Sequence, residues 1–227
     1  MRMPTIAVFK HNDEELAPRL RDSFEKAGAG YLDLVVPTLE SLPESGYDAV
    51  VVLGGSMGAY QTQEHPWLTA EKRHLCRLID ADMPVLGICL GSQILADALG
   101  GKAYLAEIPE AGVTAVRLTE SGEGHPLIAG IGHVFNMHQD TFDLPPGAQL
   151  LATSDRYSQA FEMGSALAVQ FHPEAHDELA ISWAAEDSTL LKGAGVPFED
   201  FSRQLRQFDA ELASGAAQLF DGWLARI

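Results

Sequence analysis

Short apolar runs alternate with segments of helical periodicity through the first hundred residues, and this alternation constrains the fold more than any other feature of the sequence. Such a pattern is typical of βαβ units, in which helices cover both faces of a parallel sheet. The expected strands are 5–9, 31–36, 48–53 and 84–88, and the expected helices are 13–27, 67–81 and 92–99. The sequence therefore predicts an α/β fold with an open, mostly parallel sheet.

The second half of the chain follows a different pattern. Between about 102 and 171, short strand-like pieces (113–118, 134–137, 159–162 and 166–170) are separated by Gly, Pro and Asp turns, which indicates antiparallel additions to the sheet. From Pro197 onward, apolar side chains recur at three- and four-residue steps, so we expect an amphipathic helix that docks on its own domain or forms an oligomer or partner contact. We expect one domain over 1–227, with a core at about 5–185 and a C-terminal helical extension at about 186–227.

The composition excludes several classes of function. Thirty-two acidic and 15 basic residues give a net charge of −17, and such a field repels nucleic acid and anionic membrane surfaces. The apolar runs are too short for a membrane span. The two cysteines, Cys76 and Cys89, cannot form a disulfide framework, and the chain starts without the apolar segment of a secretory signal, so a cytoplasmic protein is expected.

Cys89 follows an apolar strand and precedes a helix in the segment 87–93, GICLGSQ. Glycines two residues away on each side, Gly87 and Gly91, leave room for a sharp turn, as in the nucleophile elbow of serine hydrolases. The positive end of the following helix favours a thiolate over a thiol. Cys89 is therefore a candidate nucleophile, although a buried structural thiol would fit the same local pattern.

A candidate base follows another expected strand. Pro173 restricts His172 to an extended conformation, and in an extended chain His172 and Glu174 lie on the same side. A carboxylate on one ring nitrogen would leave the other nitrogen to face Cys89, as in a nucleophile, base and orienter triad. Taken alone, the same residues could be a polar exit from a strand.

A third segment, Leu53 to Tyr60, leaves a buried strand through Gly54 and Gly55. In a parallel sheet this loop opens at the same edge as Cys89. The backbone N–H groups of Gly55 and Leu90 could then bind a developing oxyanion. A plain glycine turn or a weak phosphate loop are the alternatives, but the Lys and Ser/Thr of a full phosphate loop are missing.

Together and in this order, residues 54–55, 87–93 and 171–174 resemble the class I glutamine amidotransferases, and most closely their stand-alone, GMP-synthase-like branch. The resemblance covers about 5–185. It implies a flavodoxin-like fold and hydrolysis of the side-chain amide of L-glutamine through a γ-glutamyl thioester, with ammonia passed to an acceptor. No metal or cofactor is expected for this chemistry.

The resemblance also implies roles for individual residues. Cys89 matches the nucleophile, His172 the general base and acid, and Glu174 the residue that orients His172. The other matched positions are the oxyanion donors Gly55 and Leu90, the elbow glycines Gly87 and Gly91, and the expected substrate-binding residues Gly54, Gln93 and His138. His138 belongs to a His-x-Asp turn that we expect near the mouth of the pocket.

Two other functions stay open at this point. A stand-alone hydrolase of γ-glutamyl peptides or amides would need no ammonia acceptor, and a non-catalytic regulatory or binding subunit would need no reactive cysteine. Only helix is expected after residue 185, without a synthetase domain. We therefore expect the ammonia acceptor on a separate synthetase partner. The sequence names neither this acceptor nor an oligomeric state.

Overall fold

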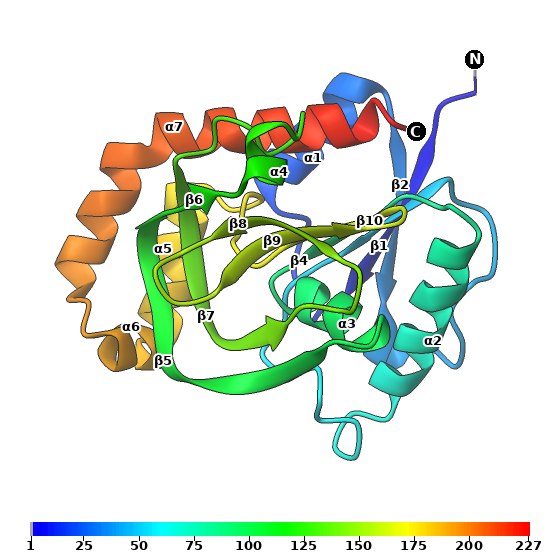
Figure 1. Cartoon of the computed structure of the whole chain (residues 1–227), viewed down its shortest axis with the longest axis horizontal. Helices are drawn as coiled ribbons and strands as arrows, with labels where there is room; N and C mark the ends of the chain where they lie inside the picture. Colours follow the sequence, from blue (N-terminus) through cyan, green and yellow to red (C-terminus); the bar gives the residue numbers. More distant parts are fainter. Residues whose placement is uncertain (1) are drawn as a thin grey trace.

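The computed structural model describes residues 2–227 and is built around an eight-stranded sheet (Figure 1). Its strands are β1 (Thr5–Lys10), β2 (Gly30–Val35), β3 (Ala49–Val52), β4 (Val85–Ile88), β6 (Arg117–Leu118), β8 (Gln149–Thr153), β9 (Ser158–Met163) and β10 (Ala166–Val169). The order across the sheet is β2-β1-β3-β4-β10-β9-β8-β6, parallel as far as β10 and antiparallel beyond it. The carboxyl ends of β3, β4 and β10 therefore meet at one edge of the sheet.

A two-stranded antiparallel sheet flanks this edge. It pairs β5 (Lys102–Ala115) with β7 (His133–Asp143), and its register shifts between Leu105 and Glu110. The sequence pattern predicted only the ends of these long strands, because the irregular pairing and Pro109 interrupt the alternation that marks a strand.

Helices cover both faces of the central sheet. The helices of the described chain are α1 (Pro18–Ala27), α2 (Trp67–Asp80), α3 (Leu90–Ala98), α4 (Glu120–Glu123), α5 (Asp177–Glu186), α6 (Thr189–Ala194) and α7 (Phe198–Leu224), with a 3₁₀ turn at Val36–Thr38. Of these, α5 and α6 pack with α7 and the β5–β7 sheet. Alternate side chains of β1 point to opposite layers: Ile6 and Val8 pack with α1 and α7, whereas Ala7 and Phe9 pack with α2 and α3. This arrangement confirms the predicted α/β fold.

The long helix α7 runs across α1 and along the edge of the β5–β7 sheet (Figure 1). Its apolar stripe, which includes Phe201, Leu205 and Trp223, is buried in the chain's own interior. The stripe is therefore occupied by intramolecular packing rather than exposed for a partner. Among residues 2–227, no helix combines the length and the apolar character that crossing a membrane requires.

The first helix begins later than the sequence predicted. We expected it from residue 13, but α1 starts at Pro18. Pro18 fits the first turn of a helix, while the residue before a proline is pushed out of the helical region, and Ala17 accordingly has φ −57° and ψ 138°. Residues 11–17 therefore form a loop at the carboxyl end of β1, next to the edge where Cys89 lies.

Candidate active site

The turn from β4 into α3 holds Cys89 in a rare backbone conformation. Its φ is +51° and its ψ is −109°, a region that residues with a side chain seldom occupy. Ser92 donates its backbone N–H and its Oγ hydrogen to the Cys89 carbonyl, at 3.0 and 2.7 Å. Cys89 thus sits at the N-terminus of α3, where unpaired N–H groups and the helix dipole favour an anion.

The two glycines of this turn leave no space for a larger residue. A Cβ on Gly87 would lie 2.5 Å from Leu95 Cδ1 and 2.7 Å from the Gly91 carbonyl oxygen. A Cβ on Gly91 would overlap the carbonyl oxygen of Val52 in β3. Both glycines therefore allow α3 to approach the sheet closely enough to form the elbow.

We expect Gly91→Ala to destabilise the protein by about 3 kcal/mol or more, because the backbone of β3 cannot move aside without breaking sheet pairing. Urea unfolding measures this change. Gly30→Ala is the matched control, since a Cβ there meets nothing within 4 Å and should change stability by less than about 0.5 kcal/mol. Equal stability of the two variants would contradict the close packing at Gly91.

His172 and Glu174 follow β10, the parallel neighbour of β4. His172 Nδ1 lies 2.7 Å from Glu174 Oε1, and both side chains are buried. The His172 N–H donates to the Phe135 carbonyl at 2.8 Å, and the Trp183 ring meets the imidazole edge to face, with centroids 5.3 Å apart. Glu174 and Trp183 thus hold the imidazole ring, and Phe135 holds the backbone that carries it.

Burial alone would lower the pKa of His172. The negative charge of Glu174, and that of Cys89 as a thiolate, outweigh this and raise the pKa of His172 well above its usual 6.5. The imidazolium form therefore persists at neutral pH, where it can stabilise a thiolate and donate a proton.

Gly54 lies against both catalytic candidates. A Cβ placed on it would be 3.3 Å from His172 Cε1 and 3.6 Å from Cys89 Cβ. The Gly55 N–H finds no hydrogen-bond acceptor within the described residues 2–227, and Leu90 is the first residue of α3, where an N–H has no partner inside the helix. The structure therefore brings together the three segments that the sequence singled out.

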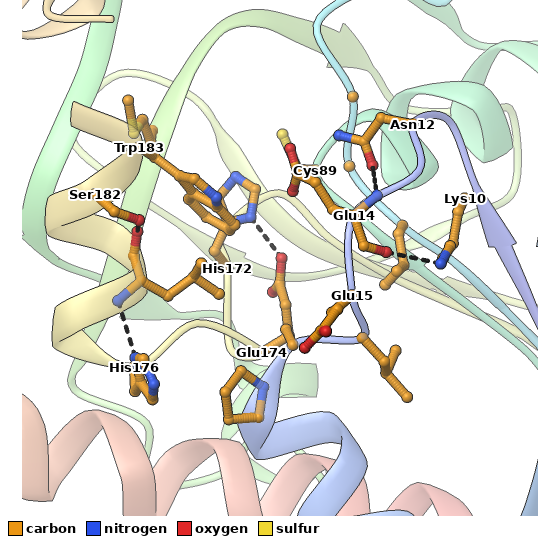
Figure 2. A pocket seen from close by; sticks show the side chains of 18 of the residues that line it. Lys10, Asn12, Glu14, Glu15, Cys89, His172, Glu174, His176, Ser182 and Trp183 are labelled. Carbon is orange, nitrogen blue, oxygen red and sulfur yellow. Dashed lines mark hydrogen bonds and ion pairs between the residues drawn. The ribbon is translucent and has the colours of Figure 1, made fainter. Parts of the chain in front are cut away.

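A cavity of about 770 Å³ opens in front of these residues. Figure 2 shows Cys89, His172 and Glu174 between the loop of Asn12 to Glu15 and helix α5, which contributes Ser182 and Trp183. The walls carry apolar side chains and several carboxylates. The volume of the cavity falls within the range of about 300–1,000 Å³ that is typical of pockets for drug-sized ligands.

The structure places Gln93 and His138 away from this cavity. Gln93 Nε2 donates to the Asp140 carbonyl at 2.9 Å, and His138 Nδ1 donates to the same oxygen at 2.9 Å. His138 Nε2 is 3.3 Å from Glu110 Oε2. We expected His138 in a turn near the pocket mouth, but β7 continues to Asp143, so His138 is a buried strand residue and does not line the cavity.

Two polar residues that the sequence analysis missed lie behind the Gly54–Gly55 loop. His11 follows β1, and Glu71 is on α2; both side chains are buried, and they face each other at 3.2 Å. The available signals were a histidine just beyond the first strand, and an acid within the apolar stripe of a helix at the spacing of Leu68, Glu71, Leu75 and Leu78.

Comparison with known proteins places the chain in a family. The family model described as Glutamine amidotransferase class-I matches residues 19–181. This protein belongs to the class I glutamine amidotransferase family. The match confirms the predicted family and, with it, the flavodoxin-like fold.

Relatives of this chain carry names from the same family. A glutamine amidotransferase-like protein of Salmonella typhimurium is 35% identical over 155 residues, which cover 60% of this chain and 64% of the relative. A glutamine-hydrolysing GMP synthase of Thermomicrobium roseum is 32% identical over 170 residues, which cover 72% of this chain and 30% of the relative. The chain thus spans less than two thirds of either relative.

Solved structures agree with these matches. The crystal structure of a glutamine amidotransferase from Thermotoga maritima superposes with a TM-score of 0.85 at 28% identity and covers 99% of each chain. A second, from Methylobacillus flagellatus, has the same TM-score at 21% identity and covers 98% of this chain and 94% of its own, so it shows the fold alone. The long helix α7 lies within the part of the chain that the Thermotoga structure matches.

Proposed function

We propose that this amidotransferase hydrolyses the side-chain amide of L-glutamine through a γ-glutamyl thioester on Cys89 and passes the ammonia to an acceptor. The observation that carries the proposal is the position of Cys89. It is held in a strained turn at a helix N-terminus and faces a cavity shared with the His172–Glu174 pair.

The first half of the reaction forms the thioester. The Cys89 thiolate attacks the amide carbonyl carbon, and the carbonyl oxygen becomes an oxyanion within reach of the N–H groups of Gly55 and Leu90. His172 gives its proton to the departing nitrogen, so that the C–N bond breaks and ammonia leaves. The γ-glutamyl group stays bonded to the sulfur of Cys89.

The second half releases glutamate. His172, now neutral, takes a proton from a water molecule as that water attacks the thioester carbonyl. Collapse of the second oxyanion breaks the C–S bond, and the Cys89 thiolate and the His172 imidazolium form again. Glu174 accepts from Nδ1 throughout and so keeps Nε2 directed at the reacting atoms.

A direct test is the formation of equal amounts of glutamate and ammonia from L-glutamine by the purified protein. We expect turnover without any added metal or cofactor. Absence of both products, at concentrations where the protein is folded, would contradict the proposal in its stand-alone form. Repeating the assay with a candidate synthetase would then show whether a partner is needed for turnover.

We propose that the partner that receives the ammonia is a synthetase. The relative from Thermomicrobium roseum is named for both glutamine hydrolysis and GMP synthesis, and this chain matches 30% of its length. The unmatched remainder of that relative leaves room for a synthetase part.

The cavity favours a second candidate function, hydrolysis of γ-glutamyl peptides or amides. At about 770 Å³ it extends well beyond the space that glutamine needs, along α5 and as far as Leu190 of α6. A γ-glutamyl conjugate would place its amine portion there. The chemistry at Cys89 would be unchanged, since only the leaving group differs.

We expect γ-glutamyl p-nitroanilide to be hydrolysed with a kcat/KM within about tenfold of that for L-glutamine, because the cavity has space for the aromatic amine. Ser182→Trp would fill that space from the exposed face of α5. It should lower kcat/KM for the anilide about tenfold or more and leave L-glutamine within threefold. Equal losses on both substrates would show that the amine portion does not occupy this part of the cavity.

A further inference from the structure

A buried histidine is enclosed directly behind the Gly54–Gly55 loop. His11 Nε2 lies 3.2 and 3.3 Å from the two carboxylate oxygens of Glu71, a side chain with no exposed surface. The Trp67 ring stacks on the imidazole, with centroids 5.3 Å apart and planes 19° from parallel. The imidazole therefore has little freedom to turn.

The other ring nitrogen of His11 reaches the loop itself. His11 Nδ1 donates to the Gly54 carbonyl oxygen at 3.1 Å. A carboxylate and a carbonyl both only accept, so each ring nitrogen carries a proton and the imidazole is positively charged. Burial would lower the pKa of His11, but the charge of Glu71 and these hydrogen bonds raise it above its usual value, which supports the charged form.

The hydrogen bond to Gly54 acts on the neighbouring N–H. The Gly54 carbonyl and the Gly55 N–H belong to one planar trans peptide and point in opposite directions, so fixing one fixes the other. The loop is tightly packed as well, since a Cβ on Gly55 would lie 2.7 Å from Leu90 Cδ2 and 3.0 Å from His11 Cβ. Glycine gives this peptide rotational freedom that the donor from His11 removes.

A buried ion pair is a poor source of stability, because removing two charges from water costs about as much as their attraction returns. We propose that His11 and Glu71 are positioning residues for the oxyanion site: Glu71 holds His11, and His11 fixes the Gly54–Gly55 peptide so that the Gly55 N–H faces the oxygen of the acyl group on Cys89. The inference rests on the proposed thioester chemistry for its effect on rate.

Two variants of His11 separate positioning from stability. In His11→Asn the amide nitrogen can occupy the place of Nδ1 and still donate to Gly54, whereas in His11→Gln it occupies the place of Nε2 and leaves Gly54 without a donor. Both lose the charge that faces Glu71, and His11→Asn also loses the donor to Glu71, so a purely structural role of the pair would harm His11→Asn at least as much as His11→Gln. The comparison therefore isolates the hydrogen bond to the loop.

For L-glutamine hydrolysis we expect His11→Gln to lower kcat by about 10- to 100-fold with KM within threefold, less than the 10²–10³-fold for deleting an oxyanion donor outright. His11→Asn should keep at least a third of the wild-type kcat. Alkylation of Cys89 by iodoacetamide forms no oxyanion, so its rate should stay within twofold of wild type in both variants.

Crystal structures of the two variants give a readout that does not depend on turnover. The Gly54–Gly55 peptide should be rotated or disordered in His11→Gln and unchanged in His11→Asn. If this holds while the wild type forms no glutamate, the proposed function fails and the positioning role stands. Equal kcat in both variants, or a Gly54 carbonyl that keeps its direction in His11→Gln, would overturn the positioning role.

Discussion

Replacing Cys89 by alanine is expected to lower glutamine hydrolysis on the order of 10⁴–10⁶-fold, the effect seen when a covalent nucleophile is deleted from a hydrolase. Without the sulfur no thioester can form, and the neighbouring groups do not supply another nucleophile at that point. Glutamate formation from L-glutamine measures the loss. The fold should be retained, because the substitution removes one atom from a side chain that already tolerates this backbone conformation.

Cys76→Ala is the matched control for this variant. Cys76 is the other free cysteine, lies on α2 and donates its thiol to the Ala98 carbonyl at 3.2 Å. We expect its kcat to stay within about twofold of wild type. Full activity in Cys89→Ala, or an equal loss in the two variants, would contradict a thioester at Cys89.

The second large effect is expected for His172→Gln, with kcat lowered by about 10²–10⁴-fold. Glutamine can neither take the proton from water nor give one to ammonia, and it carries no charge to balance the Cys89 thiolate. The iodoacetamide reaction of Cys89 at neutral pH should therefore slow together with turnover. Steady-state kinetics on L-glutamine measure the loss of turnover. Mass spectrometry of the alkylated protein measures the slower reaction of Cys89.

Glu174→Gln tests the cause of the reactivity of His172. Glu174 raises the pKa of His172, so removing its charge lets His172 lose its proton at lower pH. We expect the alkylation rate of Cys89 near pH 7 to fall, because less of the His172 imidazolium then faces the sulfur. Glu178→Gln makes the same chemical change on the exposed wall of the cavity and should leave the rate unchanged.

The His172–Glu174 pair also makes the stability of the protein depend on pH. Because folding raises the pKa of His172 above 6.5, its charged pairing with Glu174 contributes fully to the free energy of unfolding below pH 6.5 and is lost as the pH rises through the raised value. The stability difference between wild type and Glu174→Gln should therefore be largest at pH 6 and shrink at alkaline pH. Urea unfolding of both proteins, from pH 6 to alkaline pH, measures this difference.

The three segments that come together at Cys89 could be predicted from the sequence because each follows a buried strand. Gly54, Cys89 and His172 lie just beyond β3, β4 and β10, which are adjacent and parallel, so a local pattern was enough to place them at one edge. Cys89 and its glycines could be interpreted because a tight turn leaves a local signature. The sheet topology then supplies the long-range contacts.

Other features depend on contacts that no local pattern encodes. His138 was expected in a turn, but its pairing with Glu110 across the β5–β7 sheet continues the strand past it. His11 and Glu71 are 60 positions apart in the chain, and each alone looks like an ordinary polar residue. Their partnership becomes visible only when β1 and α2 are placed beside the Gly54 loop.

The most direct test of a glutamine-binding thiol at Cys89 is covalent labelling with a glutamine analogue that carries a diazoketone in place of the side-chain amide. After exposure, intact mass and peptide mapping should show one adduct per chain, on Cys89. L-Glutamine should slow its formation, and Cys89→Ala should form none. An adduct on Cys76 instead, or labelling of Cys89 that L-glutamine does not slow, would contradict the account.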